Sequence, residues 1–272
     1  MGLLDILNTF NGVSNVAESG GYNPKISVIM QSFLGDYPNS RSNPIDKFHR
    51  AVDSFLKQVY KNCELIIVSD GCEITEQQYR LKYQQHDNIK FVYVSKGDSS
   101  MYDLTTNGKF YRGVPRQAGI AISTGDIIAY MDSDDYITSD FTKNIQNQFY
   151  TNKNMKMLIN RSWYDHVNVL DKKPMYPKLP GMMNEPSDKI YKFKGIDANF
   201  VKSEMNIKYV PMSPALISHV RTNKVFWEDT MGVSEDITFV KSFRSVFGDK
   251  VTTYSNPVYV ICHSNLNAKW DV

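Results

Sequence analysis

In the first half of the chain, short apolar segments alternate with segments whose apolar residues recur at helical spacing. The apolar segments predict strands, at residues 26–30, 64–71, 89–95 and 125–135. The segments between them predict helices, at residues 48–60, 73–85 and 114–123. Strands that alternate with helices at this spacing are typical of βαβ units, so the predicted fold class is α/β with a parallel central sheet.

The second half of the chain is less regular. Residues 155–164 and 251–263 predict strands, and residues 234–247 predict a helix. Residues 171–199 carry four prolines and many lysines without a clear period, which predicts a long surface excursion. Residues 1–24 predict an N-terminal extension and linker that contains a short docking helix, with a helix that binds a membrane surface or a partner as the alternative.

Composition and charge limit the class of protein. The 272 residues include 31 basic and 29 acidic side chains, so overall charge gives no argument for nucleic acid or an anionic membrane as partner. Three cysteines, Cys63, Cys72 and Cys262, lack CxxC spacing, which favours a reducing, cytoplasmic location over a disulfide framework. No apolar run approaches the roughly 20 residues of a transmembrane helix, and the first residues do not match a secretory signal. Any membrane contact is therefore expected to be peripheral.

Acidic residues follow two of the predicted strands. Asp70 ends the second strand, and Asp132, Asp134 and Asp135 end the fourth. Parallel sheets bind ligands beyond the carboxyl ends of their strands. The alternation of side chains in a strand predicts that Asp132 and Asp134 lean to the same side, where two carboxylates suit Mg²⁺ or Mn²⁺ and a bound diphosphate. An acidic turn is the alternative, because Asp-Ser-Asp-Asp is also favourable turn chemistry.

Several motifs resemble, in order and spacing, those of the family 2 glycosyltransferases. The matching segments are Gln58-x-Tyr60-x-Asn62, Glu64 to Cys72, Pro115 to Ile120, Thr124 to Ile128 and Met131 to Asp135. The resemblance implies the GT-A fold, a Rossmann-like, mixed and mostly parallel central sheet flanked by helices. It also implies that residues 25–150 form the half that binds a nucleotide-sugar, and that residues 151–272 form the half that binds the acceptor and carries the catalytic base.

The resemblance assigns donor-site roles to matching residues. Asp70 is similar to the aspartate that hydrogen-bonds the uracil of a nucleotide-sugar, with a helix N-cap or turn residue as the alternative. Asp132 and Asp134 resemble the Asp-x-Asp motif, in which Asp134 would bind the metal directly and Asp132 would lie near the ribose or a metal-bound water. His263 follows the last predicted strand and is a candidate further metal ligand, with an ordinary polar strand end as the alternative.

Other donor-side positions are carried over in the same way. Arg116 stands where a family arginine lies close to the nucleotide, with an exposed, solvated arginine as the alternative. Ser32 and Phe33 belong to the first turn, where Gln31-Ser32-Phe33-Leu34 replaces the Pro-Thr-Tyr-Asn type of the family. Ser69 replaces the first of two aspartates in the family's second motif.

The resemblance also points to a base. Inverting members carry a Glu-Asp pair that opens a helix, and Glu235-Asp236 occupies that position here. A carboxylate must take the proton of the acceptor hydroxyl, and a helix N-terminus keeps it ionised. We therefore expect Asp236 to be the base and Glu235 to contact the acceptor or orient the site. The alternatives are simple complementation of the helix dipole and the rival pair Glu228-Asp229.

Together these features favour a metal-dependent inverting glycosyltransferase, a hexosyl- or N-acetylhexosaminyltransferase that uses Mn²⁺ or Mg²⁺. Its expected donor is a UDP-sugar, and its acceptor a carbohydrate, a lipid-linked glycan or another hydroxyl compound. The alternatives are a nucleotide-sugar-binding or scaffold protein without turnover, a transferase that acts on nucleic acid, and a sugar-1-phosphate nucleotidyltransferase. The last of these expects a Gly-rich, basic loop after the first strand, which residues 35–44 do not provide.

Overall fold

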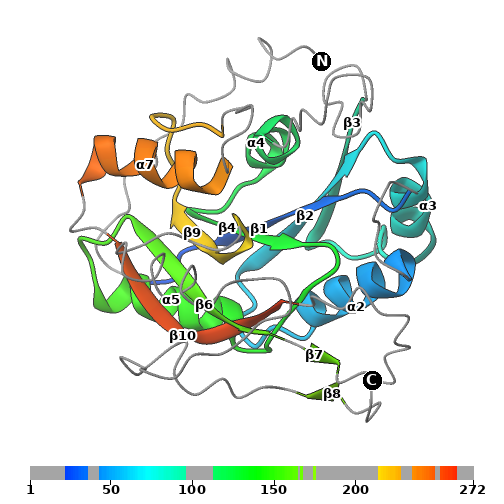
Figure 1. Ribbon diagram of the computed structural model, residues 1–272, viewed down its shortest axis with the longest axis horizontal. Helices are drawn as coiled ribbons and strands as arrows, with labels where there is room; N and C mark the ends of the chain where they lie inside the picture. Colours follow the sequence, from blue (N-terminus) through cyan, green and yellow to red (C-terminus); the bar gives the residue numbers. More distant parts are fainter. Residues whose placement is uncertain are drawn as a thin grey trace.

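A central eight-stranded sheet with helices on both faces forms the core of the protein (Figure 1). The computed structural model describes residues 22–35, 43–95, 113–164, 166–167, 174–175, 214–227, 235–248 and 252–261. The N-terminal extension up to residue 21, nearly all of the excursion at 171–199, the pair Glu228-Asp229 and His263 lie outside these residues.

The sheet is mixed and mostly parallel, with strand order β3-β2-β1-β4-β9-β6-β10-β5. Its strands are β1 Ile26–Ser32, β2 Cys63–Asp70, β3 Ile89–Val94, β4 Ile127–Asp132, β5 Tyr136–Ile137, β6 Met157–Tyr164, β9 Ile217–Val220 and β10 Thr252–Ile261. Strands β9 and β5 run antiparallel to their neighbours, and the other pairings are parallel. Strands β7 His166–Val167 and β8 Pro174–Met175 form a separate antiparallel pair.

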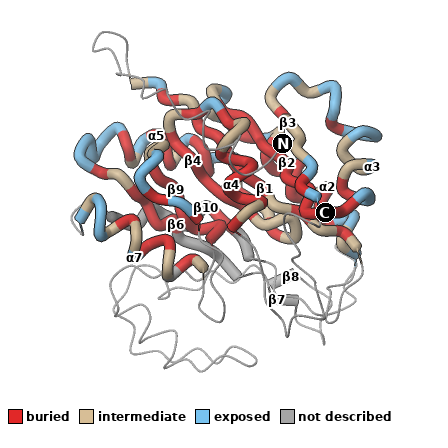
Figure 2. The backbone as a smooth tube through the Cα atoms, turned by 90° about the horizontal axis from the view of Figure 1, so that it is seen from above, coloured by how far each residue is buried: buried red, intermediate tan, exposed pale blue. Residues whose placement is uncertain are grey.

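The helices are α2 Pro44–Leu56, α3 Glu73–Lys82, α4 Gly113–Ile122, α5 Phe141–Thr151 and α7 Glu235–Phe247, with a short 3₁₀ turn, η2 Pro214–Leu216. Helices α2 and α5 lie on one face of the sheet, and α4 and α7 lie on the other (Figure 1). Because both faces are covered, the central strands are largely apolar rather than alternating, and every residue of β2 is buried (Figure 2).

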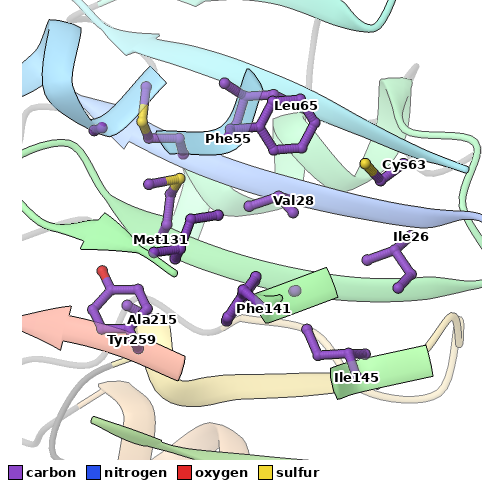
Figure 3. Close-up of a cluster of buried hydrophobic side chains, with 14 of the residues drawn as sticks. Ile26, Val28, Phe55, Cys63, Leu65, Met131, Phe141, Ile145, Ala215 and Tyr259 are labelled. Atoms are coloured by element: carbon purple, nitrogen blue, oxygen red, sulfur yellow. The ribbon is translucent and has the colours of Figure 1, made fainter. Parts of the chain in front are cut away.

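The face under α2 and α5 holds the larger apolar cluster. Helix α2 contributes Phe48, Val52 and Phe55, which recur at helical spacing and are almost completely buried. Met131 of β4 and Tyr259 of β10 belong to the same cluster, and Figure 3 shows Tyr259 beside Ala215 with Met131 next to them. Strand β10 is therefore packed against the end of β4.

Most of the predicted elements are present, but some of their boundaries differ from the prediction. The predicted helix at 48–60 begins at Pro44, a favourable first helical residue, and ends at Leu56. Val59 fits the helical spacing but is 57% exposed, so it does not extend the buried face. Helix α5 and strands β5 and β9 were not predicted. In α5, Phe141, Ile145 and Phe149 have helical spacing, but the polar residues between them hide the pattern.

Replacing Gly119 of α4 with alanine is expected to destabilise the protein by about 1–3 kcal/mol. A Cβ atom there would lie 2.5 Å from Cγ2 of Ile29 and 2.9 Å from Cγ2 of Val68, so α4 would have to move away from β1 and β2. Urea unfolding of Gly119→Ala measures the effect. A gain in stability would contradict the close approach, because alanine is better than glycine by about 1 kcal/mol in a helix with free space.

Candidate active site

The carboxyl ends of β2, β1 and β4 lie side by side at one edge of the sheet. In the strand register Gln31 of β1 is opposite Asp132 of β4, and Ser32 is opposite Ser69 of β2. The chain proceeds from β1 to β2 and β3 on one side and then returns to β4 on the other side of β1. This reversal of strand order between β1 and β4 is where open α/β sheets bind ligands.

Asp70 is the last residue of β2, and its carboxylate is held at this edge. The residue is 1% exposed, and Gln31 Nε2 donates a hydrogen bond to its Oδ2 at 3.0 Å. The N-cap of α3 is Cys72, so the alternative of Asp70 as a helix N-cap is wrong. Gln31 entered the sequence analysis only as a departure from the family pattern, and its contact with Asp70 was not foreseen.

Ser32 and Phe33, the two site candidates that follow Gln31, are buried and partly buried. Ser32 is 1% exposed, and its hydroxyl lies 3.3 Å from that of Thr75 in α3. Phe33 is partly buried against the apolar cluster below α2. Both residues lie beside Gln31 at the carboxyl end of β1, and their contact with a nucleotide stays a prediction.

The acidic cluster after β4 forms a turn. The strand ends at Asp132, and the N–H of Asp135 donates to the carbonyl of Asp132 at 3.2 Å. The turn that the Asp-Ser-Asp-Asp sequence favours is therefore present, and Asp134 lies in it rather than in the strand. That the side chains of Asp132 and Asp134 lean to the same side stays a prediction. Asp135 is 2% exposed and accepts a hydrogen bond from the Tyr259 hydroxyl at 2.9 Å, whereas Asp132 and Asp134 are only partly buried. The cluster thus divides into one internal carboxylate and two at the sheet edge.

The residues present fit a divalent cation that is shared with a phosphate. Asp132 and Asp134 supply hard carboxylate oxygens, and within the described residues no group of three His, Cys, Asp or Glu side chains could enclose a metal. Mg²⁺ is commonly held by one or two carboxylates together with substrate phosphates and waters, so two are sufficient. His263, the third proposed ligand, lies outside the described part of the chain.

Glu235 and Asp236 form the first turn of α7, which lies on the same face of the sheet as α4. Asp236 is 5% exposed, and Glu235 is partly buried. Arg116 of α4 is also 5% exposed, so the alternative of a solvated arginine is wrong. Its Nη1 lies 3.4 Å from Oε1 of Glu235, and its guanidinium lies 4.9 Å from the centre of the Trp227 ring. Arg116 therefore joins α4 to the N-terminus of α7.

A buried chain of hydrogen bonds supports this junction. Trp227 Nε1 donates to the Tyr130 hydroxyl, and that hydroxyl lies 2.8 Å from Nε2 of His219. His219 Nδ1 lies 2.8 Å from the carbonyl of Val220, which only accepts, so we assign the proton to Nδ1 and the acceptor role to Nε2. Burial lowers the pKa of His219 to about 4, so the ring is neutral at pH 7.

These hydrogen bonds and the Trp227 ring connect the end of β4 with α7. The Trp227 ring stacks on Phe239 of α7 at 4.1 Å, and Tyr130 lies on β4, two residues before Asp132. Trp227 is 5% exposed and therefore packs in the core. Strand β4 therefore ends at Asp132, and its Tyr130 supports helix α7, which begins with Glu235 and Asp236, through Trp227.

Similarity to known proteins is found at the level of sequence and fold. A sequence model of glycosyl transferase family 2 matches residues 43–200, more than half of the chain. The chain is 22% identical over 96 residues to the glycosyltransferase GlyA of Streptococcus pneumoniae and 30% identical over 116 residues to the bifunctional glycosyltransferase pgtA of Dictyostelium discoideum. These alignments cover 35% and 41% of the chain, and 12% and 14% of the two relatives.

Solved structures of S. aureus TarS, residues 1–349, share the fold. The TM-score is 0.55 at 17% identity, with 88% of this chain and 60% of that chain covered. TarS has also been solved in complex with UDP and in complex with UDP-GlcNAc. This likeness confirms the predicted GT-A fold.

The segment that matches the family model includes some of the candidate site residues and not others. It contains Asp70, Arg116, Asp132 and Asp134, whereas α7 with Glu235 and Asp236 lies beyond it. Among the helices that the structure describes, none has the length and apolar character needed to span a bilayer. Because a family model covers more than half of the sequence and the fold agrees, the chain belongs to glycosyl transferase family 2.

Proposed function

We propose that the protein is a metal-dependent, inverting glycosyltransferase that moves a sugar from a UDP-sugar to an acceptor hydroxyl. The observation that carries the proposal is the meeting of Asp70, Asp132 and Asp134 at the point where the strand order reverses, with the acidic start of α7 tied to the same edge through Arg116. The UDP and UDP-GlcNAc complexes of TarS support a nucleotide-sugar donor.

In this proposal the donor lies across the ends of β2, β1 and β4. Asp70, oriented by Gln31, accepts a hydrogen bond from the N–H of uracil. Asp132 and Asp134 would hold Mn²⁺ or Mg²⁺ together with the diphosphate, and the ion would supply positive charge against the leaving diphosphate. Ser32, the last residue of β1, and Phe33, which follows it, line the nucleotide end of the site.

Asp236 takes the proton of the acceptor hydroxyl as that oxygen attacks the anomeric carbon from the face opposite the diphosphate. An α-linked UDP-sugar would then give a β-glycoside. The N-terminus of α7 stabilises the ionised carboxylate before the transfer. Glu235 holds Arg116 beside the donor, which favours its role in orienting the site over contact with the acceptor. The acceptor, a carbohydrate, lipid-linked glycan or other hydroxyl compound, would enter from the half formed by residues 151–272, opposite the donor half at 25–150.

Calorimetric titration with UDP tests the donor site. In Mn²⁺ we expect wild-type protein to bind UDP, and we expect EDTA or Asp134→Ala to weaken binding by more than about tenfold, because the diphosphate loses its shared cation. Asp87→Ala is the matched control, since Asp87 is exposed and precedes β3 at the opposite edge of the sheet. Absence of UDP binding by wild type under every condition would contradict the proposal.

A further inference from the structure

The turn that carries Asp132 and Asp134 is held by two residues from distant parts of the chain. Tyr259 of β10 contacts it from the buried side, and Arg50 of α2 contacts it at the following carbonyl. Neither residue belongs to a motif that the sequence analysis singled out.

The Tyr259 hydroxyl makes two hydrogen bonds within the turn. It accepts from the backbone N–H of Asp132 at 2.9 Å and donates to Oδ2 of Asp135 at 2.9 Å. The side chain is completely buried, and its strand pairs with β5 immediately after the turn, with Tyr259 opposite Ile137. The hydroxyl therefore fixes the backbone of the first carboxylate and keeps the Asp135 carboxylate inside the protein.

Arg50 holds the other half of the turn. Its Nη2 donates to the carbonyl of Asp134 at 2.8 Å, and its guanidinium lies 5.0 Å from the centre of the Tyr136 ring. A planar guanidinium can donate and stack at the same time, which an ammonium group does less well. The backbone of the second carboxylate is thus fixed from α2, on the other side of the turn from β10.

We propose that Tyr259 and Arg50 are positioning residues that pre-form the turn for a divalent cation and a diphosphate. Two carboxylates close together repel each other, so an unsupported turn would separate them until the cation arrived. Backbone contacts at Asp132 and Asp134 remove that freedom before binding, and metal sites lose affinity when such supporting contacts are removed. The inference rests on the proposed metal-dependent donor site and adds the two residues that hold it in place.

The test uses two variants. Tyr259→Phe removes the hydroxyl and keeps the size of the ring, and Arg50→Lys removes the planar donor and keeps the positive charge. Calorimetry measures UDP affinity with Mn²⁺ and with EDTA for each variant, at a temperature where circular dichroism shows it folded. We expect affinity in Mn²⁺ to fall by about 10- to 100-fold, with affinity in EDTA changed less than about twofold. In the Asp134→Ala background, Tyr259→Phe should have almost no further effect on UDP affinity, because the part of binding that depends on Mn²⁺ is already lost.

Matched controls separate positioning from general stability. Tyr83→Phe removes a buried tyrosine hydroxyl between α2 and α3, and Arg80→Lys alters an exposed arginine on α3. Both controls should bind UDP in Mn²⁺ as wild type does. If Tyr259→Phe and Arg50→Lys both lower the melting temperature but bind UDP in Mn²⁺ as wild type does, the inference is overturned while the proposed function stands. A wild-type protein whose UDP binding ignores Mn²⁺ would overturn both.

Discussion

Asp236→Asn is expected to lower turnover of the nucleotide-sugar by about 10²- to 10⁴-fold, the range that a positioned general base contributes. Asparagine has the same shape but cannot take the proton of the acceptor hydroxyl. Asp236 is 5% exposed in the first turn of α7, so a solvent base cannot easily replace it. UDP release from the best donor of a UDP-sugar panel measures turnover, and calorimetry measures UDP binding, which should be unchanged.

The matched control for this experiment is Asp140→Asn. Asp140 is also a carboxylate at a helix N-terminus, but it is exposed and precedes α5 on the opposite face of the sheet. We expect Asp140→Asn to leave turnover unchanged. That result would show that removing a negative charge from a helix N-terminus does not by itself explain the loss of turnover in Asp236→Asn. Asp236→Asn turnover within tenfold of wild type would make the base assignment wrong. Intact UDP binding by a wild-type protein that turns over no donor would favour the nucleotide-sugar-binding protein considered from the sequence.

The junction between α4 and α7 gives the two halves of the reaction a common support. Arg116 contacts Glu235 and the Trp227 ring, and Trp227 stacks on Phe239 one turn further along α7. Because every group of this junction is buried or nearly so, its contacts are little screened by solvent. The position of Asp236 is therefore fixed relative to β4 through Tyr130, rather than by α7 alone.

The sequence predicted the elements whose patterns are local. The strands at 26–30, 64–71 and 89–95 are apolar runs between turn residues, and the structure confirms them as β1, β2 and β3. The carboxyl ends of parallel strands meet at one edge of a sheet, so the sequence alone predicts that Asp70 and Asp132 lie at the same edge. The turn at Asp134 was one of two predictions for Asp-Ser-Asp-Asp, and the sequence could not decide between them, because the residue at which a strand ends depends on contacts from elsewhere in the chain.

Contacts between distant segments were beyond sequence reasoning. Gln31, Arg50 and Tyr259 reach the site from β1, α2 and β10, and no spacing in the sequence relates them to Asp70 or Asp132. Tyr259 in particular lies between two valines of a strand, in a sequence that is typical of core packing. Only the sheet order, which places β10 beside β5, brings it to the turn.

Two of the sequence motifs prove to be joined at the other edge of the sheet. Glu64, which opens the second motif, accepts hydrogen bonds from the N–H and hydroxyl of Thr124, which opens the fourth. The N–H of Gly125 donates to Ser27, and a Cβ there would lie 2.5 Å from the Ser27 nitrogen and 2.8 Å from the Lys25 carbonyl oxygen. Their spacing therefore reflects packing of β1, β2 and β4, far from the candidate site.

The stability of the protein is expected to fall steeply between about pH 5 and pH 2 because of Glu64. Burial alone would raise the pKa of this carboxyl, but hydrogen bonds from Ser27, Thr124, Lys90 and Lys25 lower it to about 2. The pKa in the folded state is thus below its ordinary value of 4.5. The stabilisation is complete above pH 4.5 and is lost as the pH falls towards 2, and this shift corresponds to about 3 kcal/mol.

Glu64→Gln removes that contribution at every pH. The variant should be less stable than wild type at pH 7 by about 2–4 kcal/mol, because Lys25 and Lys90 lose their partner and the amide cannot accept as strongly. Its stability should also vary less between pH 5 and pH 2. Urea unfolding across that range compares it with Glu76→Gln, whose ion pair with Arg80 lies at the surface and should be worth less than about 1 kcal/mol. Parallel pH profiles for wild type and Glu64→Gln would show that another carboxylate governs the acid transition. Such a result would remove the electrostatic explanation for the pairing of the two motifs and leave packing around Gly125 to account for it.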